Sequence, residues 1–341
     1  MKSSTTQPSP ADEVRIAEGT HGVLTGSAIP SDENFADISL RGPGALGAKR
    51  LVRVHRGFDA HWVGDGFPVR SVFDYEGLGQ DELSPFLLMD YAGPALFPAN
   101  NKRRGVGEHP HRGFETVTLG YQGSVAHRDS SGGGGVIGPG DVQWMTAASG
   151  VMHEEMHAEE FTRKGGVFEV VQLWVNLPAK DKMGRPRYQA ITAADIPTVP
   201  LAGGAGTLRV IAGEAGGTRG PAKTFTPINL WDGHLRAGAS ARLEIPEGQT
   251  AAIFVRNGRL VFGGAEKEHA GQAELAVFTR EGGVITLTAQ IDADFVVLAG
   301  EPIDEPVYGH GPFVMNTEEE IRQAILDVRS GRFGRLSPTG T

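Results

Sequence analysis

The sequence predicts an all-β protein with two consecutive domains and one helix at the C-terminus. Its 341 residues include 49 glycines and 21 prolines, and short apolar runs alternate with these turn residues along most of the chain. The length suits about two ordinary domains, and a hydrophobic content of 39% can supply a core for each. We therefore expect many short strands joined by tight turns.

The first domain is expected at residues 46–190, after a polar N-terminal arm. Residues 1–45 are rich in Ser, Thr, Pro and Gly, so we expect this arm to be poorly ordered. The central strands are expected in "FETVTLGYQGSVAHRD", "GGVIGPGDVQWMTA" and "VFEVVQLWVNLP". The last of these is apolar on both faces, which is typical of a strand covered on both sides. The glycine run 132–135 is not followed by the Lys-Ser or Lys-Thr of a phosphate loop, and we interpret it as a hairpin loop.

The second domain is expected at residues 191–341 and ends in a helix. In "LEIPEGQTAAIFVRNGRLVFGG", the pair Asn257-Gly258 predicts a tight hairpin turn between two strands. In the tail "NTEEEIRQAILDVRSGRFG", Thr317 and Glu320 form a capping-box pattern, an apolar stripe follows, and Gly331 stands where a helix would end. We expect this helix to pack across a sheet.

Composition and charge argue against several classes of protein. The net charge is -9 and the basic residues are scattered, so direct nucleic-acid binding is not expected. The chain has no cysteine, which excludes disulfides, thiolate metal ligands and cysteine nucleophiles. No apolar run resembles a signal peptide or is long enough to span a bilayer. We expect a cytoplasmic protein that makes no contact with a membrane.

Two clusters of histidine and glutamate are candidates for a metal site. In "GVGEHPHRGFETVT", His109, His111 and Glu115 have the same parity, so an extended strand would direct them to one face. "SGVMHEEMH" repeats the pattern with His153 and Glu155. Strands far apart in sequence face each other across a barrel, so the two clusters can converge. Nitrogen and oxygen ligands suit iron, manganese, nickel, copper or zinc, and a site of this kind leaves positions open for a substrate or dioxygen.

The pattern leaves some ligand choices open. Glu115 and Glu155 compete for the single carboxylate position, and periodicity does not separate them. Glu154 should point to the opposite face and His157 lies near the strand end, so both are weaker candidates. The other histidines, which we interpret as structural, are isolated in sequence: His21, His55, His61, His127, His234, His269 and His310. Trp144, Met145, Phe114 and Val151 are candidate walls of a pocket, although each could equally be a core residue.

Several long motifs resemble the pirin family of the cupin superfamily. They are "GEHPHRGFETVT", "PGDVQWMTAASGVMHEE", "QLWVNLP", "RYQ" and "GPFVMNTEEEIRQAILDVRSGRFG", and they extend from about residue 60 to 335. The resemblance implies two tandem cupin (jelly-roll-like) β-barrels, with iron in the first and no metal in the second, whose segment "PEGQTAAIFVRNG" carries no histidine. It also implies that the ligands are His109, His111, His153 and Glu155. Glu115 then becomes a nearby acid.

The chain differs from the family pattern in its longer N-terminal arm and in His157, which would be an extra ligand or a pocket acid. The resemblance implies a monomeric, iron-dependent enzyme similar to quercetin 2,3-dioxygenases, which opens a flavonol with dioxygen. Glu155 would then act in catalysis as the acceptor of the flavonol proton. The alternative that the family allows is a non-enzymatic, iron-dependent redox sensor that binds a protein partner, as a transcription coregulator would. The open metal positions favour the enzyme.

Overall fold

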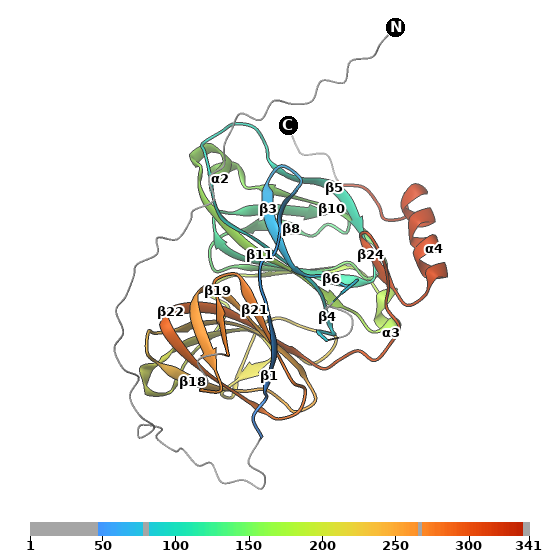
Figure 1. The fold of residues 1–341 in the computed structure, drawn as a ribbon. Coiled ribbons are helices and arrows are strands. Elements are labelled where there is room, and N and C mark those ends of the chain that lie inside the picture. The colour runs from blue at the N-terminus through green and yellow to red at the C-terminus, as the bar shows by residue number, and fades with distance from the viewer. Residues whose placement is uncertain (1–46, 78–81, 265–267, 337–341) are drawn as a thin grey trace.

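The computed structural model describes residues 47–77, 82–264 and 268–336, which form two β-barrels, one above the other in Figure 1. The predicted fold class, two tandem β-barrels with a C-terminal helix, is confirmed. The arm expected at residues 1–45, with His21 in it, lies outside the described residues. No helix of the described part of the chain is long and apolar enough to cross a membrane.

The first barrel combines a seven-stranded and a four-stranded antiparallel sheet. In spatial order, the larger sheet contains β12 (Arg187–Ile191), β9 (Val142–Thr146), β6 (Phe114–Gln122), β11 (Gly166–Asn176), β4 (Phe86–Phe97), β3 (Phe67–Phe73) and β2 (Ala60–Val63). The smaller sheet contains β5 (Gly105–His111), β10 (Val151–His157), β7 (Val125–Asp129) and β8 (Gly134–Ile137). The glycine-rich segment joins β7 to β8, as expected of a hairpin loop.

The second barrel is built on one nine-stranded antiparallel sheet. Its main path is β1 (Leu51–His55), β21 (Glu274–Phe278), β19 (Thr250–Phe262), β22 (Val284–Gly300), β17 (Ile228–Leu235), β14 (Gly206–Ala212) and β13 (Thr198–Pro200). The long strand β22 also pairs with β18 (Ser240–Glu244), and β19 pairs with β20 (His269–Gly271). A small hairpin of β15 (Glu214–Ala215) and β16 (Thr218–Arg219) and the 3-10 turn η1 (Ala202–Gly204) complete this part.

Within residues 47–336, apart from the two short gaps, the structure describes three α-helices, and only the C-terminal one is long. They are α2 (Glu159–Lys164), α3 (Ala179–Lys182) and α4 (Glu318–Arg329). The capping box of α4 is confirmed, because Thr317 accepts a hydrogen bond from the backbone N–H of Glu320 while the Glu320 carboxylate accepts one from Thr317. Gly331 follows the helix end with a φ of 75°, which suits glycine.

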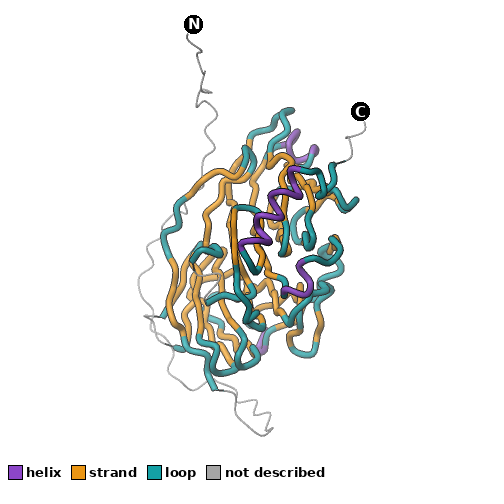
Figure 2. The backbone as a smooth tube through the Cα atoms, turned by 90° about the vertical axis from the view of Figure 1, so that its right-hand side faces the viewer, coloured by secondary structure: helices purple, strands orange, loops and turns teal. Residues whose placement is uncertain are grey.

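Both ends of the described chain cross to the other barrel. β1 precedes the first barrel in sequence but pairs with β21 of the second. β23 (Tyr308–His310), β24 (Phe313–Met315) and α4 follow the second barrel but lie beside β5 of the first (Figures 1 and 2). The boundaries 46–190 and 191–341 remain predictions about the linear sequence. In space, the two barrels are joined by this exchange of strands.

Side chains along β6 alternate between the apolar core that the two barrels share and the interior of the first barrel. Val117 and Leu119 belong to a large buried cluster that continues into the second barrel through residues such as Phe254 and Val296. Thr116 and Thr118 point the other way, into the first barrel, where Thr118 contacts other polar side chains. The apolar core between the barrels therefore fixes which side chains of this strand face the interior.

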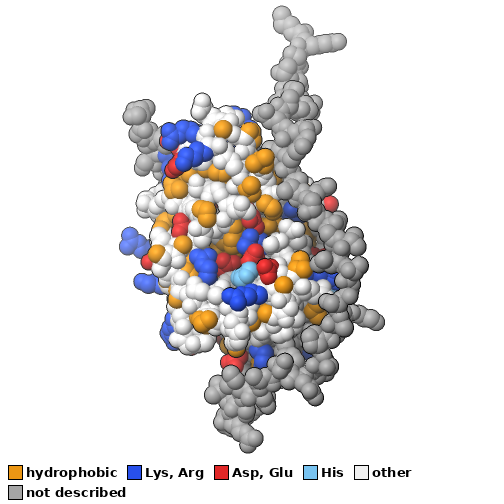
Figure 3. Space-filling view, turned by 90° about the vertical axis from the view of Figure 1, so that its left-hand side faces the viewer, with side chains coloured by type: hydrophobic (Ala, Val, Ile, Leu, Met, Phe, Trp, Pro, Cys, Tyr) orange, Lys and Arg blue, Asp and Glu red, His pale blue; other side chains and the backbone are white. Residues whose placement is uncertain are grey.

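A network of charged side chains adds to the contact between the barrels. Arg256 of β19 binds Glu169 of β11 at 2.8 Å, and its guanidinium lies 4.0 Å from the ring centre of Tyr121. Asp232 of β17 binds Arg209 at 3.0 Å and accepts a hydrogen bond from the Tyr121 hydroxyl. Figure 3 shows side chains of both signs gathered around a hollow at mid-height of the molecule.

The hairpin predicted at Asn257-Gly258 is wrong. β19 continues through both residues and pairs with β22 on either side of them, with irregular register at Asn257. Gly258 has a φ of 85°, and a Cβ atom there would lie 2.2 Å from the Asp292 carbonyl oxygen. The glycine therefore serves a bulge and a close backbone approach, which is a common alternative use of glycine within a strand.

Candidate metal centre

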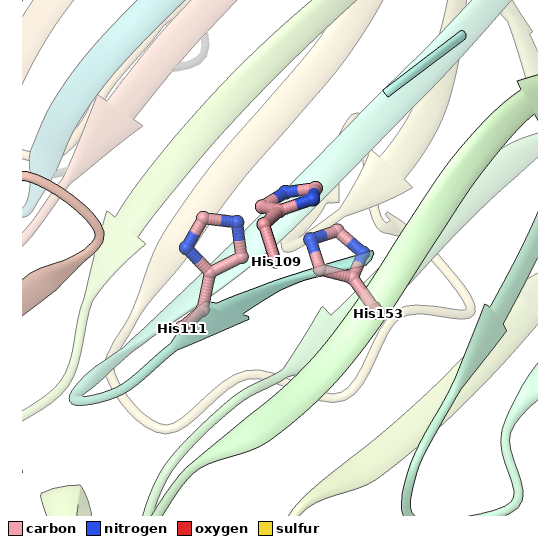
Figure 4. Close-up of side chains that lie close together, drawn as sticks. All are labelled: His109, His111 and His153. Carbon is pink, nitrogen blue, oxygen red and sulfur yellow. The ribbon is translucent and has the colours of Figure 1, made fainter. Parts of the chain in front are cut away.

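Two paired strands bring three histidines together. In the antiparallel pair of β5 and β10, His153 lies opposite His109, and Val151 lies opposite His111. The ring centre of His153 lies 4.1 Å from that of His109 and 4.7 Å from that of His111. One ligand nitrogen from each ring lies within 4.8 Å of the other two, and the three rings surround a common point (Figure 4). The two histidine clusters therefore converge as predicted.

The burial of this site favours neutral imidazoles. His111 and His153 are buried, whereas His109 is half-buried. Burial, with a smaller contribution from the neighbouring histidines, holds the pKa values of His111 and His153 well below the ordinary value. Neutral imidazole is the form that binds a metal. The two buried rings are therefore ready to act as ligands at neutral pH.

The Nδ1 atom of each ring has a neighbour outside the cluster. It lies 2.8 Å from the Gly107 carbonyl oxygen for His109 and 3.4 Å from the Pro312 carbonyl oxygen for His111. The Nδ1 atom of His153 lies 3.3 Å from Nδ1 of His127. Outer contacts of this kind orient metal-binding imidazoles. They leave Nε2 as the atom that each ring can offer to a metal.

A transition-metal ion fits this arrangement. Nε2 of His153 is buried and has no hydrogen-bond partner in the described part of the chain. A buried polar atom without a partner is costly and rare unless something else satisfies it. Three imidazole nitrogens with no sulfur form a donor set for divalent iron, manganese, nickel, copper or zinc.

Glu155 lies in the same barrel, but it is not part of the group of three histidines. Its side chain is buried and accepts hydrogen bonds from Gln143 at 3.0 Å and Thr118 at 3.2 Å. Glu154 points outward to Arg103 and Arg128, in agreement with the expected alternation along β10. The assignment of Glu155 as a ligand therefore remains a proposal.

Glu115 does not share a strand with the first two histidines. β5 ends at His111 and β6 begins at Phe114, because Gly113 adopts a φ of 92° and turns the chain. The expectation of one continuous strand from 109 to 115 is therefore wrong. The Glu115 carboxylate accepts a hydrogen bond from Thr146, and burial raises the pKa of Glu115 to about 7.

His157 is neither a fourth histidine of the cluster nor a pocket acid. Its ring lies among phenylalanines, 4.6 Å from the ring centre of Phe97 and 4.5 Å from that of Phe168. Its Nε2 lies 2.8 Å from the Gly66 carbonyl oxygen, so it can donate a hydrogen bond there. Burial lowers the pKa of His157 to about 4. These contacts assign it to the core at the far end of β10.

The predicted pocket walls separate into two groups. Phe114 lies beside the site, with its ring centre 5.1 Å from that of His111, and Met145 and Val151 form a small buried cluster at the same barrel. Trp144 takes the alternative role, that of a core residue, because it belongs to the core between the barrels. The strand alternation places it on the opposite face from Met145.

Sequence reasoning missed two residues at the site. Trp174 of β11 stacks on Phe114 at 4.2 Å and lies 5.2 Å from His111. The sequence shows it only as one apolar residue of the strand expected in "VFEVVQLWVNLP", which is apolar on both faces. His127 was interpreted as isolated, yet it is buried beside His153 and Asp129. The sequence signal that could have found it is the motif "HRD" on a strand, because its first and last residues, His127 and Asp129, face the same side.

The remaining histidines lie outside the group of three. His55 and His61 are on β1 and β2, while His234 lies 2.9 Å from an oxygen of Asp294 in the second barrel. His269 and His310 are on β20 and β23. The structural interpretation of these five remains a prediction.

The segment after the second barrel forms one wall of the site. Besides the Pro312 carbonyl near His111, Arg112 binds Asp327 of α4 at 2.9 Å, and both side chains are buried. Lys182 donates hydrogen bonds to the carbonyl oxygens of Gly113 and Val314, at 2.7 and 2.9 Å. The helix expected to pack across a sheet is therefore anchored next to a metal-ligand candidate.

Comparisons with known proteins agree with this architecture. The pirin family profile matches residues 66–175, and the profile of the pirin C-terminal cupin domain matches residues 230–334. A Pseudomonas aeruginosa protein provisionally named a quercetin 2,3-dioxygenase is 55% identical over 287 residues, which are 84% of this chain and 99% of that protein. Pirin from Mus musculus is 41% identical over 256 residues, 74% of this chain and 83% of its own.

A solved structure gives the same result. The crystal structure of a quercetin 2,3-dioxygenase from Acinetobacter baumannii has a TM-score of 0.81 and 51% identity to this chain. The match covers 84% of this chain and 99% of that one. The pirin profile match at residues 66–175 contains all three histidines of the candidate site. The chain therefore belongs to the pirin family of the cupin superfamily.

Proposed function

We propose that this chain is an iron(II)-dependent dioxygenase that opens the ring of a flavonol such as quercetin. The observation that carries the proposal is the group of three histidines, in which each Nδ1 has an outer neighbour and the buried Nε2 of His153 has none in the described residues. A three-histidine site leaves positions open, as catalysis requires. The names of relatives at 55% and 51% identity support the same reaction class.

The residues that would hold the metal are His109, His111, His153 and Glu155. We include Glu155 because it follows His153 by two residues on β10 and therefore faces the same side of the strand. When bound, the ion would supply a Lewis acid for the flavonol hydroxyl and a place for dioxygen beside it. Manganese, nickel, copper and zinc suit the same donors, and iron is the choice implied by the family.

The remaining roles belong to side chains around the site. Phe114 and Trp174 form a stacked aromatic wall beside His111, which suits a planar aromatic substrate. Glu155 is the proposed base for the proton of the flavonol 3-hydroxyl. Thr118 and Gln143 hydrogen-bond to its carboxylate and so orient it.

Oxygen uptake tests the proposal. The protein would be loaded with iron(II) under anaerobic conditions, and dioxygen and quercetin would be followed together after mixing. We expect equimolar consumption of both by the wild type, no consumption by His153→Ala, and unchanged consumption by His61→Ala, which alters an exposed histidine of β2. Stoichiometric iron without oxygen uptake, for quercetin and for related flavonols and catechols, would refute the proposed activity.

One observation favours the alternative, a redox sensor that acts on a protein partner. The Pro312 carbonyl near His111 and the Arg112–Asp327 ion pair connect the candidate site to α4, whose other face is exposed. A change of metal charge could thus reach an outer surface. Equal capture of proteins from the native lysate by the iron(II) and iron(III) forms would remove this alternative.

A further inference from the structure

Two buried side chains form a chain behind the candidate ligand His153. Nδ1 of His153 lies 3.3 Å from Nδ1 of His127, and Nε2 of His127 lies 3.2 Å from Oδ2 of Asp129. The side chains of His127 and Asp129 have no exposed surface. Tyr188 stacks on the His127 ring at 5.1 Å with an interplanar angle of 10°, which fixes the plane of that ring. The hydrogen-bonded side chains of His127 and Asp129 are therefore shielded from water and held in one geometry.

The contacts of Asp129 determine which atoms carry hydrogen. Its Oδ1 accepts hydrogen bonds from the backbone N–H groups of Ser131 and Gly133, at 2.8 and 3.1 Å, and from the Ser131 hydroxyl at 2.6 Å. An ionised carboxylate has only acceptors, so Oδ2 requires a hydrogen on Nε2 of His127. A neutral His127 then presents a lone pair at Nδ1. That lone pair can accept only if His153 carries its hydrogen on Nδ1.

We propose that Asp129, acting through His127, fixes His153 in the tautomer that is protonated at Nδ1 and so keeps its Nε2 free to bind a metal. Asp129 and His127 are positioning residues in this proposal, since neither belongs to the group of three candidate ligands. The buried Nε2 of His153, without a partner in the described residues, is the lone pair that this tautomer exposes. Outer-shell carboxylates that set the tautomer of a ligand histidine are a general device of metal sites. The inference rests on the proposed metal site, and it is independent of the dioxygenase reaction.

The fold makes Asp129→Asn an unusually selective test. The two loop N–H groups require an acceptor at the Oδ1 position, so the asparagine should keep its oxygen there and turn its NH₂ group to His127. His127 would then accept at Nε2 and carry its hydrogen on Nδ1. His153 would be forced to accept at Nδ1 and to carry its hydrogen on Nε2, where it blocks a metal.

Two measurements read this change without any assay of activity. In metal-free protein labelled with ¹⁵N-histidine, long-range ¹H–¹⁵N spectra would identify the protonated nitrogen of His153. We expect Nδ1 in the wild type and Nε2 in Asp129→Asn. Competition with a chromophoric chelator would measure zinc(II) affinity, and we expect a loss of about 10- to 100-fold in Asp129→Asn. Asp141→Asn is the matched control, because Asp141 also accepts backbone N–H groups, from Gly138 and Ala193, in a loop away from the site. It should keep the wild-type affinity.

A double variant separates the relay from a general structural effect. His127→Phe keeps an aromatic ring against Tyr188 but removes both nitrogens, so it should weaken zinc(II) binding less than Asp129→Asn does. Adding His127→Phe to Asp129→Asn should restore affinity to the level of the His127→Phe variant, because the misplaced hydrogen is gone. Additive losses, or an unchanged His153 tautomer in Asp129→Asn, would overturn the proposal. If Asp129→Asn does not fold, the tautomer of His153 in the wild type tests the proposal by itself. A hydrogen on Nε2 would overturn the proposal, and a hydrogen on Nδ1 would support it.

Discussion

The ion pair between Arg112 and Asp327 should be a main attachment of the C-terminal helix. Arg112 follows His111, donates to Asp327 at 2.9 Å and to the Ser149 carbonyl at 2.8 Å, and places its guanidinium 4.6 Å from the ring centre of Phe333. Burial alone would raise the pKa of Asp327, yet the hydrogen bonds from Arg112 and other donors hold it below the ordinary value. The pair is therefore charged and enclosed.

Replacing Asp327 by Asn would leave the buried Arg112 charge without a counterion. Breaking a buried pair in this way costs about 3–5 kcal/mol, and a domain of this size loses roughly 2–4 °C of Tm per kcal/mol. Arg332→Ala is the matched control, because Arg332 contacts the other oxygen of the same carboxylate at 2.5 Å from an exposed position. Such an exposed pair contributes about 1 kcal/mol or less.

Calorimetry and metal analysis together test this reasoning. We expect a fall in Tm of roughly 6–20 °C for Asp327→Asn and no more than about 4 °C for Arg332→Ala. Because the Pro312 carbonyl near His111 belongs to the same segment, Asp327→Asn should also lower the metal content of the purified protein. Equal and small shifts of Tm in the two variants would refute the assignment of this pair as an anchor.

Three further outcomes are expected. Burial lowers the pKa of His157 to about 4, below its value in the unfolded chain, so the unfolded state takes up the proton first as the pH falls. The free energy of unfolding should therefore decrease by up to about 3 kcal/mol between about pH 6.5 and pH 4. Chemical denaturation of metal-free His157→Phe should show a flatter dependence of stability on pH, and an unchanged slope would contradict this. Glu155→Gln should weaken metal binding far more than Glu115→Gln in chelator competition, and similar losses would disprove the ligand assignment. Trp174→Leu should raise the KM for quercetin without loss of iron, whereas Trp62→Leu, on the outer surface, should leave the KM as it is; a shared effect would remove Trp174 from the substrate wall.

The candidate site was predictable wherever the local pattern was sufficient. His109 and His111 alternate on a strand, and His153 repeats the signal, so their parity already directed each cluster to one face. Glu115 failed the same reasoning because the turn at Gly113 separates it from that strand. His127 was missed because its partner His153 lies on a neighbouring strand, and the pairing of β7 with β10 cannot be read from one sequence.

The sequence by itself determined the all-β class, the capped C-terminal helix, the residue types available to a metal and, through long motifs, the family. These properties depend on local periodicity, turn chemistry and composition, which act over a few residues. Only the tertiary structure decided that β1 and α4 cross between the barrels, that Asn257-Gly258 forms a bulge, and that Trp174, His127 and the Pro312 carbonyl lie next to the histidines. Contacts of this kind join segments far apart in the chain, and they are selected by the burial of whole sheet faces rather than by any local preference.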